Sequence, residues 1–322
     1  MMVVQRFALA LFLVAVFQQA AAAELVIGSP VPLGINSPQA DFDPSVKHDG
    51  LSIYFATNRP GGTGGGSDIW TATRPSLGSP FGTPTPLSTN VNTTSQDIEP
   101  AIRFDGLQMY FRRSMETPVP DAPDADLFVA NRASTGDPFG AAVPAGSALN
   151  SPSFDGSPEF SADGLTMIFS STRPGGTGTA DLWSATRSSL SDPFSNPVNL
   201  GPTVNSANID GDPAISPDGL LLVFSSNRPG GLGGFDLWAT QRASLADPFG
   251  TPVNLGPIVN TTQFDTTPDI GPDLTLYFAR GETLGGLDIY SVQLVPEPST
   301  WALLALGLAL AGPLAYWRRR RS

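Results

Sequence analysis

Five aspartates recur along the chain, and each stands three residues before a proline. A second acidic residue follows each of them within four positions. Clustered carboxylates could bind Ca²⁺ through oxygen ligands or accept hydrogen bonds from a sugar. Two or three unequal carboxylates could instead hydrolyse a glycosidic bond. The recurring residues are Asp41, Asp97, Asp155, Asp210 and Asp265, and the second set is Asp43, Glu99, Glu159, Asp212 and Asp269.

The spacing of these aspartates defines a repeat. Each is followed eight residues later by another aspartate in a turn, and the units begin 56, 58, 55 and 55 residues apart. The third unit shows the pattern: short strands over 157–161, 165–169 and 181–185, then an extended segment over 193–200. An Asp-Gly turn joins the first two strands, which is a strong hairpin signal. Four short strands per unit are typical of a propeller blade.

The ends of the array predict how the ring closes. The fifth unit, which begins near position 265, lacks a fourth strand before the tail starts. Residues 29–34 (Ser-Pro-Val-Pro-Leu-Gly) match residues 251–256 of the fourth unit. A strand supplied from there would pair the open sheet edge. We therefore predict an all-β fold, a five-bladed propeller over residues 24–294 closed by the N-terminal strand. An open solenoid is the alternative.

The repeat also resembles a known family. Residues 216–219 (Ser-Pro-Asp-Gly), 223–228 and 236–238 (Asp-Leu-Trp) are similar to the WD40-like (PD40) repeats of TolB-type propellers. The resemblance covers most of residues 41–294 and implies a docking or scaffolding surface. That family usually has six blades and an additional domain, so the resemblance leaves the partner open.

The propeller interpretation places the five recurring aspartates just before the innermost strands, around one mouth of the central channel. We predict from this position that they bind a ligand. The alternative is that each one accepts hydrogen bonds from backbone N–H groups where one blade passes to the next. Recurrence in every unit favours this structural role. If the role is structural, replacement of Asp210 by Asn is expected to cost little stability, because Asn keeps an acceptor oxygen. Binding of Ca²⁺ by the ring stays open.

Other residues recur at fixed offsets and are predicted to be structural. Ion pairs within or between blades are expected between two sets of arginines and the aspartates that open the third strands. The arginines are 59, 173 and 228 in Arg-Pro-Gly-Gly loops and 74, 132, 187 and 242, six residues after four of the aspartates; the aspartates are 68, 126, 181, 236 and 288. The aromatic residues two positions after those aspartates are expected to pack between blades. The acidic, proline-rich loop 115–124 of the second unit is a candidate recognition feature.

We predict from these patterns that the protein is not an enzyme and has no catalytic residue. The acids recur with the repeat, and His48, the only histidine, lies beside a turn. No P-loop, zinc signature or nucleophile elbow occurs, so no cofactor or metal centre is predicted. A protein or an exopolysaccharide at the cell surface is the expected partner. The alternative is a polysaccharide-active glycoside hydrolase that uses carboxylates at the channel mouth.

Both ends of the chain predict export. Arg6, the apolar run 7–17 and the alanines 20–23 have the order of a signal peptide, with residues 1–23 removed by signal peptidase. At the other end Pro296, Glu297 and Pro298 precede an apolar segment, 301–317, and four arginines. The arginines orient that predicted transmembrane helix with its C-terminus in the cytoplasm.

Residues 295–322 resemble the PEP-CTERM sorting tail. The resemblance implies that an exosortase removes the helix, so contact with the membrane is transient and the mature protein reaches the cell surface or the medium. The chain contains no cysteine, so its stability depends on its core instead of on disulfides. The formal net charge of −12 disfavours nucleic acid as a partner.

Overall fold

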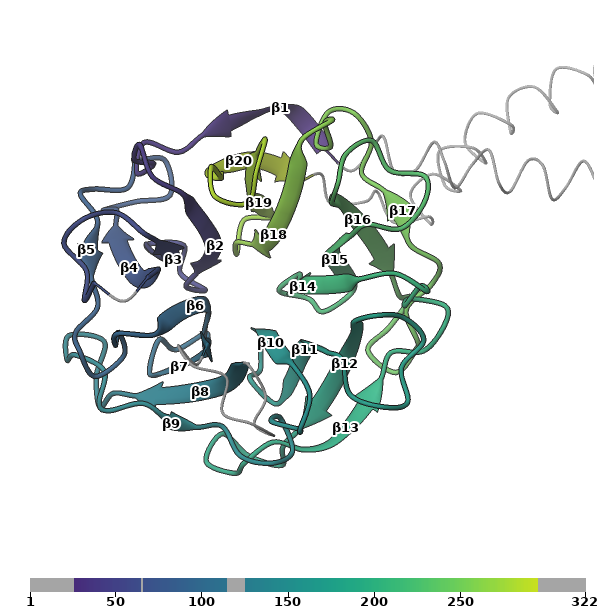
Figure 1. Cartoon of the computed structure of the whole chain (residues 1–322), viewed down its shortest axis with the longest axis horizontal. Helices are drawn as coiled ribbons and strands as arrows, with labels where there is room; N and C mark the ends of the chain where they lie inside the picture. Colours follow the sequence, from purple (N-terminus) through teal and green to yellow (C-terminus); the bar gives the residue numbers. More distant parts are fainter. Residues whose placement is uncertain (1–25, 65, 115–124, 295–322) are drawn as a thin grey trace, which may run out of the picture.

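The computed structural model describes residues 26–64, 66–114 and 125–294, which form one five-bladed propeller (Figure 1). The predicted signal peptide, the loop 115–124, the sorting motif and the helix 301–317 lie outside these residues. Within the described part of the chain, no helix has the length and apolar character needed to cross a membrane. The all-β prediction is confirmed.

Each blade is a four-stranded antiparallel sheet. In blades 1 to 4 the strands follow one another in chain order from the channel outward, whereas the outermost strand of blade 5 is β1. Blades 1 and 2 contain β2 (Asp41–Val46), β3 (Ser52–Thr57), β4 (Asp68–Thr73), β5 (Thr85–Pro86), β6 (Gln96–Ile102), β7 (Gln108–Ser114), β8 (Ala125–Asn131) and β9 (Val143–Pro144). Blades 3 and 4 contain β10 (Asp155–Phe160), β11 (Thr166–Ser171), β12 (Asp181–Thr186), β13 (Ser195–Asn199), β14 (Asp210–Ile215), β15 (Leu221–Ser226), β16 (Asp236–Gln241) and β17 (Val253–Asn254). Blade 5 contains β18 (Phe264–Ile270), β19 (Thr275–Gly281), β20 (Asp288–Leu294) and β1 (Val26–Pro32).

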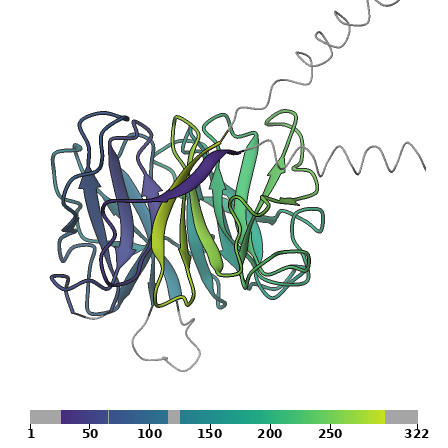
Figure 2. The ribbon, with the colours of Figure 1, turned by 90° about the horizontal axis from the view of Figure 1, so that it is seen from above.

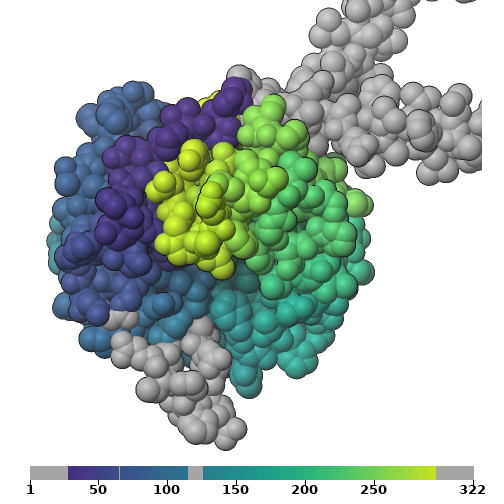
Figure 3. All heavy atoms as spheres, turned by 45° about the horizontal axis from the view of Figure 1, so that its top comes forward, coloured from purple at the N-terminus to yellow at the C-terminus, as the bar shows by residue number. Residues whose placement is uncertain are grey.

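The first strand of the chain closes the ring, as predicted. Strand β1 pairs with β20 through Val31 opposite Ser291 and Pro32 opposite Tyr290. The Asn36 side chain continues this contact, because its Nδ2 donates to the Ile289 carbonyl at 2.9 Å and its Oδ1 accepts from the Ile289 N–H at 3.0 Å. Figure 2 shows β1 beside the yellow strands of blade 5, and in Figure 3 the purple and yellow surfaces share a border. The outer edge of β20 is therefore paired.

The core lies between neighbouring blades. The second strand of each blade carries a phenylalanine with no exposed surface. In the third strand of each blade, the aromatic residue two positions after the first aspartate is largely buried beside that phenylalanine. The fully buried phenylalanines are Phe55, Phe111, Phe169, Phe224 and Phe278. Burial of large aromatic side chains supplies the stability of a chain without disulfides.

Candidate functional site

The five recurring aspartates are fully buried and bonded to protein groups. Each carboxylate accepts the backbone N–H four residues earlier and forms an ion pair with an arginine of its own blade. Asp210 illustrates this: Oδ2 accepts from the Ser206 N–H at 2.5 Å, and Oδ1 accepts from Ser226 Oγ at 2.6 Å and from Arg228 Nη2 at 2.5 Å. The five pairs are Asp41–Arg59, Asp97–Arg113, Asp155–Arg173, Asp210–Arg228 and Asp265–Arg280.

Ligand binding by these five aspartates stays a prediction. The structure gives their oxygen atoms protein partners, and none of the five is among the residues that line the channel cavities described below.

The expected partners of the arginines were wrong. Sequence offsets suggested pairing of Arg59, Arg173 and Arg228 with aspartates 68, 181 and 236, but these arginines bind the aspartates of the first strands. Strand register explains the difference, because the first strand lies antiparallel to the second. Asp210, for instance, stands opposite Ser226, two residues before Arg228. Asp236 instead accepts backbone N–H groups from its own glycine-rich loop, at Leu232 and Gly233.

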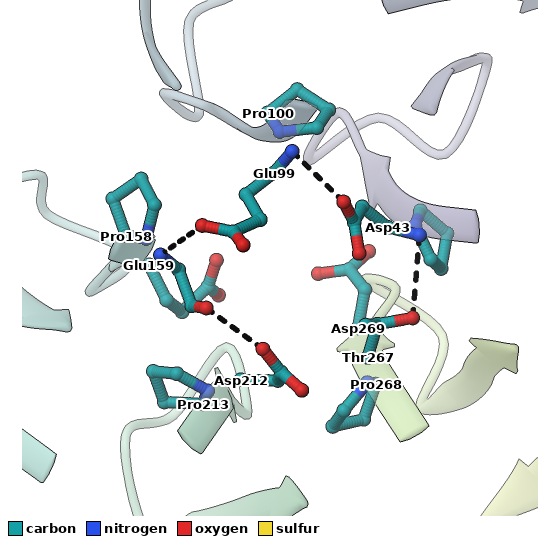
Figure 4. A pocket seen from close by; sticks show the side chains of 12 residues that line it. Asp43, Glu99, Pro100, Pro158, Glu159, Asp212, Pro213, Thr267, Pro268 and Asp269 are labelled. Carbon is teal, nitrogen blue, oxygen red and sulfur yellow. Dashed lines mark hydrogen bonds between the residues drawn. The ribbon is translucent and has the colours of Figure 1, made fainter. Parts of the chain in front are cut away.

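Three members of the second acidic set, Asp43, Glu99 and Asp212, reach the channel through a bulge that recurs in every blade. The residue before each repeat proline has a left-handed backbone, with φ between 46° and 55°. A non-glycine residue in that region is strained, and β-bulges redirect side chains in this way. These positions are Asp43, Glu99, Ser157, Asp212 and Thr267. All five residues line one small cavity, and Figure 4 shows Asp43, Glu99, Asp212 and Thr267 around it.

Hydrogen bonds join these side chains from blade to blade. The Glu99 N–H donates to Asp43 Oδ2 at 3.0 Å, and the Ser157 N–H donates to Glu99 Oε2 at 2.6 Å. Ser157 Oγ donates to Asp212 Oδ1 at 2.7 Å, and the Asp43 N–H donates to Thr267 Oγ1 at 3.2 Å (Figure 4). The ring therefore ties neighbouring blades together and holds three carboxyl groups close to one another.

The three carboxyl groups have unequal surroundings. Burial, together with the nearby charges of Glu99 and Asp212, raises the pKa of Asp43 well above its ordinary value. Glu99 is paired with a cation, because Arg112 Nε donates to its Oε1 at 2.7 Å. Asp212 accepts hydroxyl hydrogen bonds from Ser157 and from Thr266. The site thus combines a carboxyl group that favours its protonated form with a carboxylate that is held next to a guanidinium.

A funnel of about 280 Å³ opens above this acidic floor, at the mouth from which the first strands start. Its walls are mainly apolar and come from different blades, whereas its floor is formed by Asp43, Glu99 and Asp212. The wall residues include Phe42, Ile98, Phe154, Phe235 and Leu287. The loops of the innermost and third strands position these side chains around the same opening.

Below the ring, Glu159 and Asp269 stand apart from the repeat. The matching positions of the other blades hold Ser45, Ala101 and Ala214. Burial raises the pKa of Asp269 to about 7. Burial and the charge of Asp269 raise the pKa of Glu159 well above its ordinary value. Two cavities touch the pair, one of about 30 Å³ that the ring carboxyls also line and one of about 50 Å³ on the other side, and each has room for water but not for a sugar ring.

The sequence analysis placed Glu159 and Asp269 in the second acidic set but did not recognise them as a pair that departs from the repeat. Alignment of the five repeats at the fourth position after each recurring aspartate would have found it, since only two of the five residues there are acidic. Among the residues that the structure describes, no group of three His, Cys, Asp or Glu side chains is arranged to hold a metal ion.

The C-terminal residues match a family model. Residues 294–321 match the PEP-CTERM protein-sorting motif. The chain ends in an exosortase sorting signal. This motif implies export, processing by an exosortase, and transit to the cell surface while anchored in the membrane.

Solved structures share the propeller fold at low sequence identity. The alpha-L-arabinofuranosidase from Lactobacillus brevis is 14% identical with a TM-score of 0.57, covering 84% of this chain and 94% of that enzyme. The catalytic domain of a GH62 alpha-L-arabinofuranosidase from Coprinopsis cinerea is 12% identical with a TM-score of 0.55, covering 85% and 98%. TolB from Acinetobacter baumannii is 13% identical with a TM-score of 0.49, covering 79% of this chain and 55% of TolB. No curated protein matches the sequence.

The prediction that the protein is not an enzyme is contradicted by these structures. Alpha-L-arabinofuranosidases and a family-43 glycoside hydrolase share its fold. Recurrence of the acids was the ground for that prediction, but recurring positions still acquire unequal surroundings, as Asp43 and Glu99 show. The fold is thus compatible with both binding and hydrolysis.

Proposed function

We propose that this exported propeller binds a sugar residue of a polysaccharide in the funnel at the channel mouth. The observation that carries the proposal is the combination of aromatic walls with a floor of three carboxyl groups in one cavity of about 280 Å³. Small-molecule sites are concave, mostly apolar cavities with a few placed polar groups, and typically measure about 300–1,000 Å³. A cavity just below that range suits one sugar residue.

The chemistry of the lining suits a sugar. The C–H face of a pyranose or furanose ring can lie on Phe42 or Phe154, while its hydroxyl groups donate to Asp212 and Glu99. Residue types of this kind are unsuited to a phosphate, because carboxylates would repel it. The sorting motif implies transit to the cell surface, and this supports an extracellular polysaccharide as the source of the sugar.

A glycan array probed with the purified protein tests the proposal. We expect binding to at least one glycan, and Phe42→Ala and Asp212→Asn should each weaken it about tenfold or more. Val143→Ala is the matched control, since Val143 lies on the outermost strand of blade 2 and is 52% exposed. Binding that both funnel variants leave unchanged would disprove a sugar site in the funnel.

Hydrolysis is a second candidate function, and the raised pKa of Asp43 beside the Arg112-paired Glu99 favours it. A protonated carboxyl group can act as general acid while a nearby carboxylate serves as base or nucleophile. The test is release of reducing sugar from the glycan that the array identifies. Asp43→Asn should abolish release and leave glycan binding intact; absence of release by the unaltered protein would exclude this candidate.

A further inference from the structure

The interfaces between blades are built from a repeated set of side chains. An arginine that follows the third strand lies over a phenylalanine of the same blade, with 4.4 to 4.6 Å from the guanidinium carbon to the ring centre. The four pairs are Arg74–Phe81, Arg132–Phe139, Arg187–Phe194 and Arg242–Phe249. Because the set recurs, the blades serve as controls for one another.

In three interfaces a tyrosine of the preceding blade completes the set. Arg132 Nη2 donates to the Tyr54 hydroxyl at 3.0 Å, and Arg74 Nη2 donates to the Tyr277 hydroxyl at 3.2 Å. Tyr110 lies edge-on to Phe194, with ring centres 5.8 Å apart, and in this interface the ring packs without a hydrogen bond to Arg187, whose Nη1 donates to Gln108 Oε1 instead. All three tyrosines are at most 4% exposed, so each ring fills its interface.

The interface between blades 3 and 4 lacks the tyrosine. Ile168 occupies that position, while Arg242 and Phe249 are both retained. A groove of about 560 Å³ is present there, lined by Ile168, Arg242 and Phe249 together with Val198 and Leu245. Arg242 Nε donates to the Gly219 carbonyl at 2.8 Å. Within the described ranges of the chain, Arg242 Nη2 has no tyrosine hydroxyl to donate to, whereas Arg132 Nη2 donates to the Tyr54 hydroxyl.

The interface between blades 4 and 5 shows the other way to dispense with the tyrosine. Val223 takes the tyrosine position and Leu294 takes the arginine position, and the two belong to one buried apolar cluster. There the cation and the hydroxyl acceptor are both absent, so no polar group is left over. The blade 3–4 groove instead keeps the arginine and the phenylalanine but has neither the tyrosine ring nor its hydroxyl group.

We propose that the groove between blades 3 and 4 binds the side chain of an exposed tyrosine from a partner polypeptide. The groove offers an aromatic ring and a guanidinium in the arrangement that receives a tyrosine in other interfaces. Exposed apolar residues at its rim, Val198 (59% exposed) and Leu245 (66% exposed), can contact the residues that flank the tyrosine. The groove opens on the face of the propeller opposite the funnel, because it is lined by the Asp-Gly turns that connect the first and second strands of blades 3 and 4.

The charge of the groove also favours a neutral phenol over an anionic aromatic group. Asp163, Asp218 and Asp247 line the groove along with the single cation of Arg242. A phosphotyrosine or an aromatic carboxylate would meet this excess of negative charge, whereas a phenol hydroxyl accepts from Arg242 without adding any. The site is separate from the sugar funnel and does not depend on it.

The test is an NMR titration of the full chain with N-acetyltyrosinamide and with N-acetylphenylalaninamide. We expect the tyrosine amide to bind about tenfold more tightly, because a hydrogen bond to a charged group discriminates by about that factor. Ile168→Tyr fills the groove as in the other blades and should weaken binding of the tyrosine amide at least tenfold. Ile168→Val is the matched control and should keep binding within about twofold.

A second variant keeps the test decisive if Ile168→Tyr fails to fold, which circular dichroism would reveal. Arg242→Gln removes the cation but leaves Phe249 in place, so the two amides should then bind within about twofold of each other. Equal binding of the two amides to the unaltered protein would overturn the proposal. Undiminished binding of the tyrosine amide by folded Ile168→Tyr would overturn it as well.

Discussion

Replacement of Asp210 by asparagine should destabilise the propeller far more than the loss of a backbone cap. Asn keeps an oxygen that can accept from the Ser206 N–H, so a cap alone would lose little. The substitution also removes the negative charge that meets Arg228 Nη2 at 2.5 Å. In that ion pair the Asp210 side chain is 0% exposed and the Arg228 side chain 11%, so the guanidinium loses its counter-charge in a nearly dry site.

The magnitude follows from those surroundings. Breaking a buried ion pair by neutralising one partner costs about 3–5 kcal/mol. Arg228 keeps other contacts, since its Nη2 donates to the Val204 carbonyl at 2.7 Å and its guanidinium lies 5.2 Å from the Trp238 ring centre. We therefore expect the lower end, about 3 kcal/mol, for Asp210→Asn. Asp210→Ala also loses the cap, which adds about 1 kcal/mol.

Urea unfolding at pH 7, followed by tryptophan fluorescence, measures both variants. Asp218→Asn is the matched control, because Asp218 is an exposed turn residue of the same blade and should change stability by less than about 0.5 kcal/mol. Arg228→Met in the Asp210→Asn background should recover part of the loss, since the unpaired charge is gone. A cost below about 1 kcal/mol for Asp210→Asn would refute the ion-pair argument and leave the cap as the whole explanation.

Three further predictions concern pH, closure and processing. Because burial raises the folded-state pKa of Asp269 to about 7 from an ordinary value of 3.8, the folded chain binds a proton that the unfolded chain has released. Stability should therefore fall as pH rises from about 4 to about 7. Asp269→Asn should flatten the dependence of melting temperature on pH, and an unchanged slope in that variant would count against the raised pKa of Asp269. Deletion of residues 24–37 removes β1 and should unfold the ring cooperatively, so a melting temperature like that of the full chain would contradict closure by β1. Mass spectrometry of the surface form should find a start near Glu24 and no peptide beyond about Thr300, whereas recovery of residues 301–322 there would contradict exosortase processing.

The sequence alone determined the parts of this protein that depend on spacing along the chain. Repeated Asp-x-x-Pro units at intervals of 55 to 58 residues predicted five blades, because each blade is one local supersecondary unit. The match of residues 29–34 to residues 251–256 predicted closure by β1, since an unpaired sheet edge is unfavourable. The Pro-Glu-Pro tail with its apolar segment and arginines predicted the sorting motif, which is a linear signal read from the chain itself.

Only the tertiary structure decided which acids face the channel and which are buried. Asp210 and Asp212 are two residues apart, yet the bulge at Asp212 and Pro213 leaves Asp210 against Arg228 and places Asp212 in the funnel floor. The isolation of Glu159 and Asp269, and the groove left by Ile168, depend likewise on residues of other blades. Arg242 lies 74 positions from Ile168, and no local pattern relates them. Side-chain environments in a propeller arise from packing between blades, and that packing is set by the closed ring and not by the order of residues within one repeat.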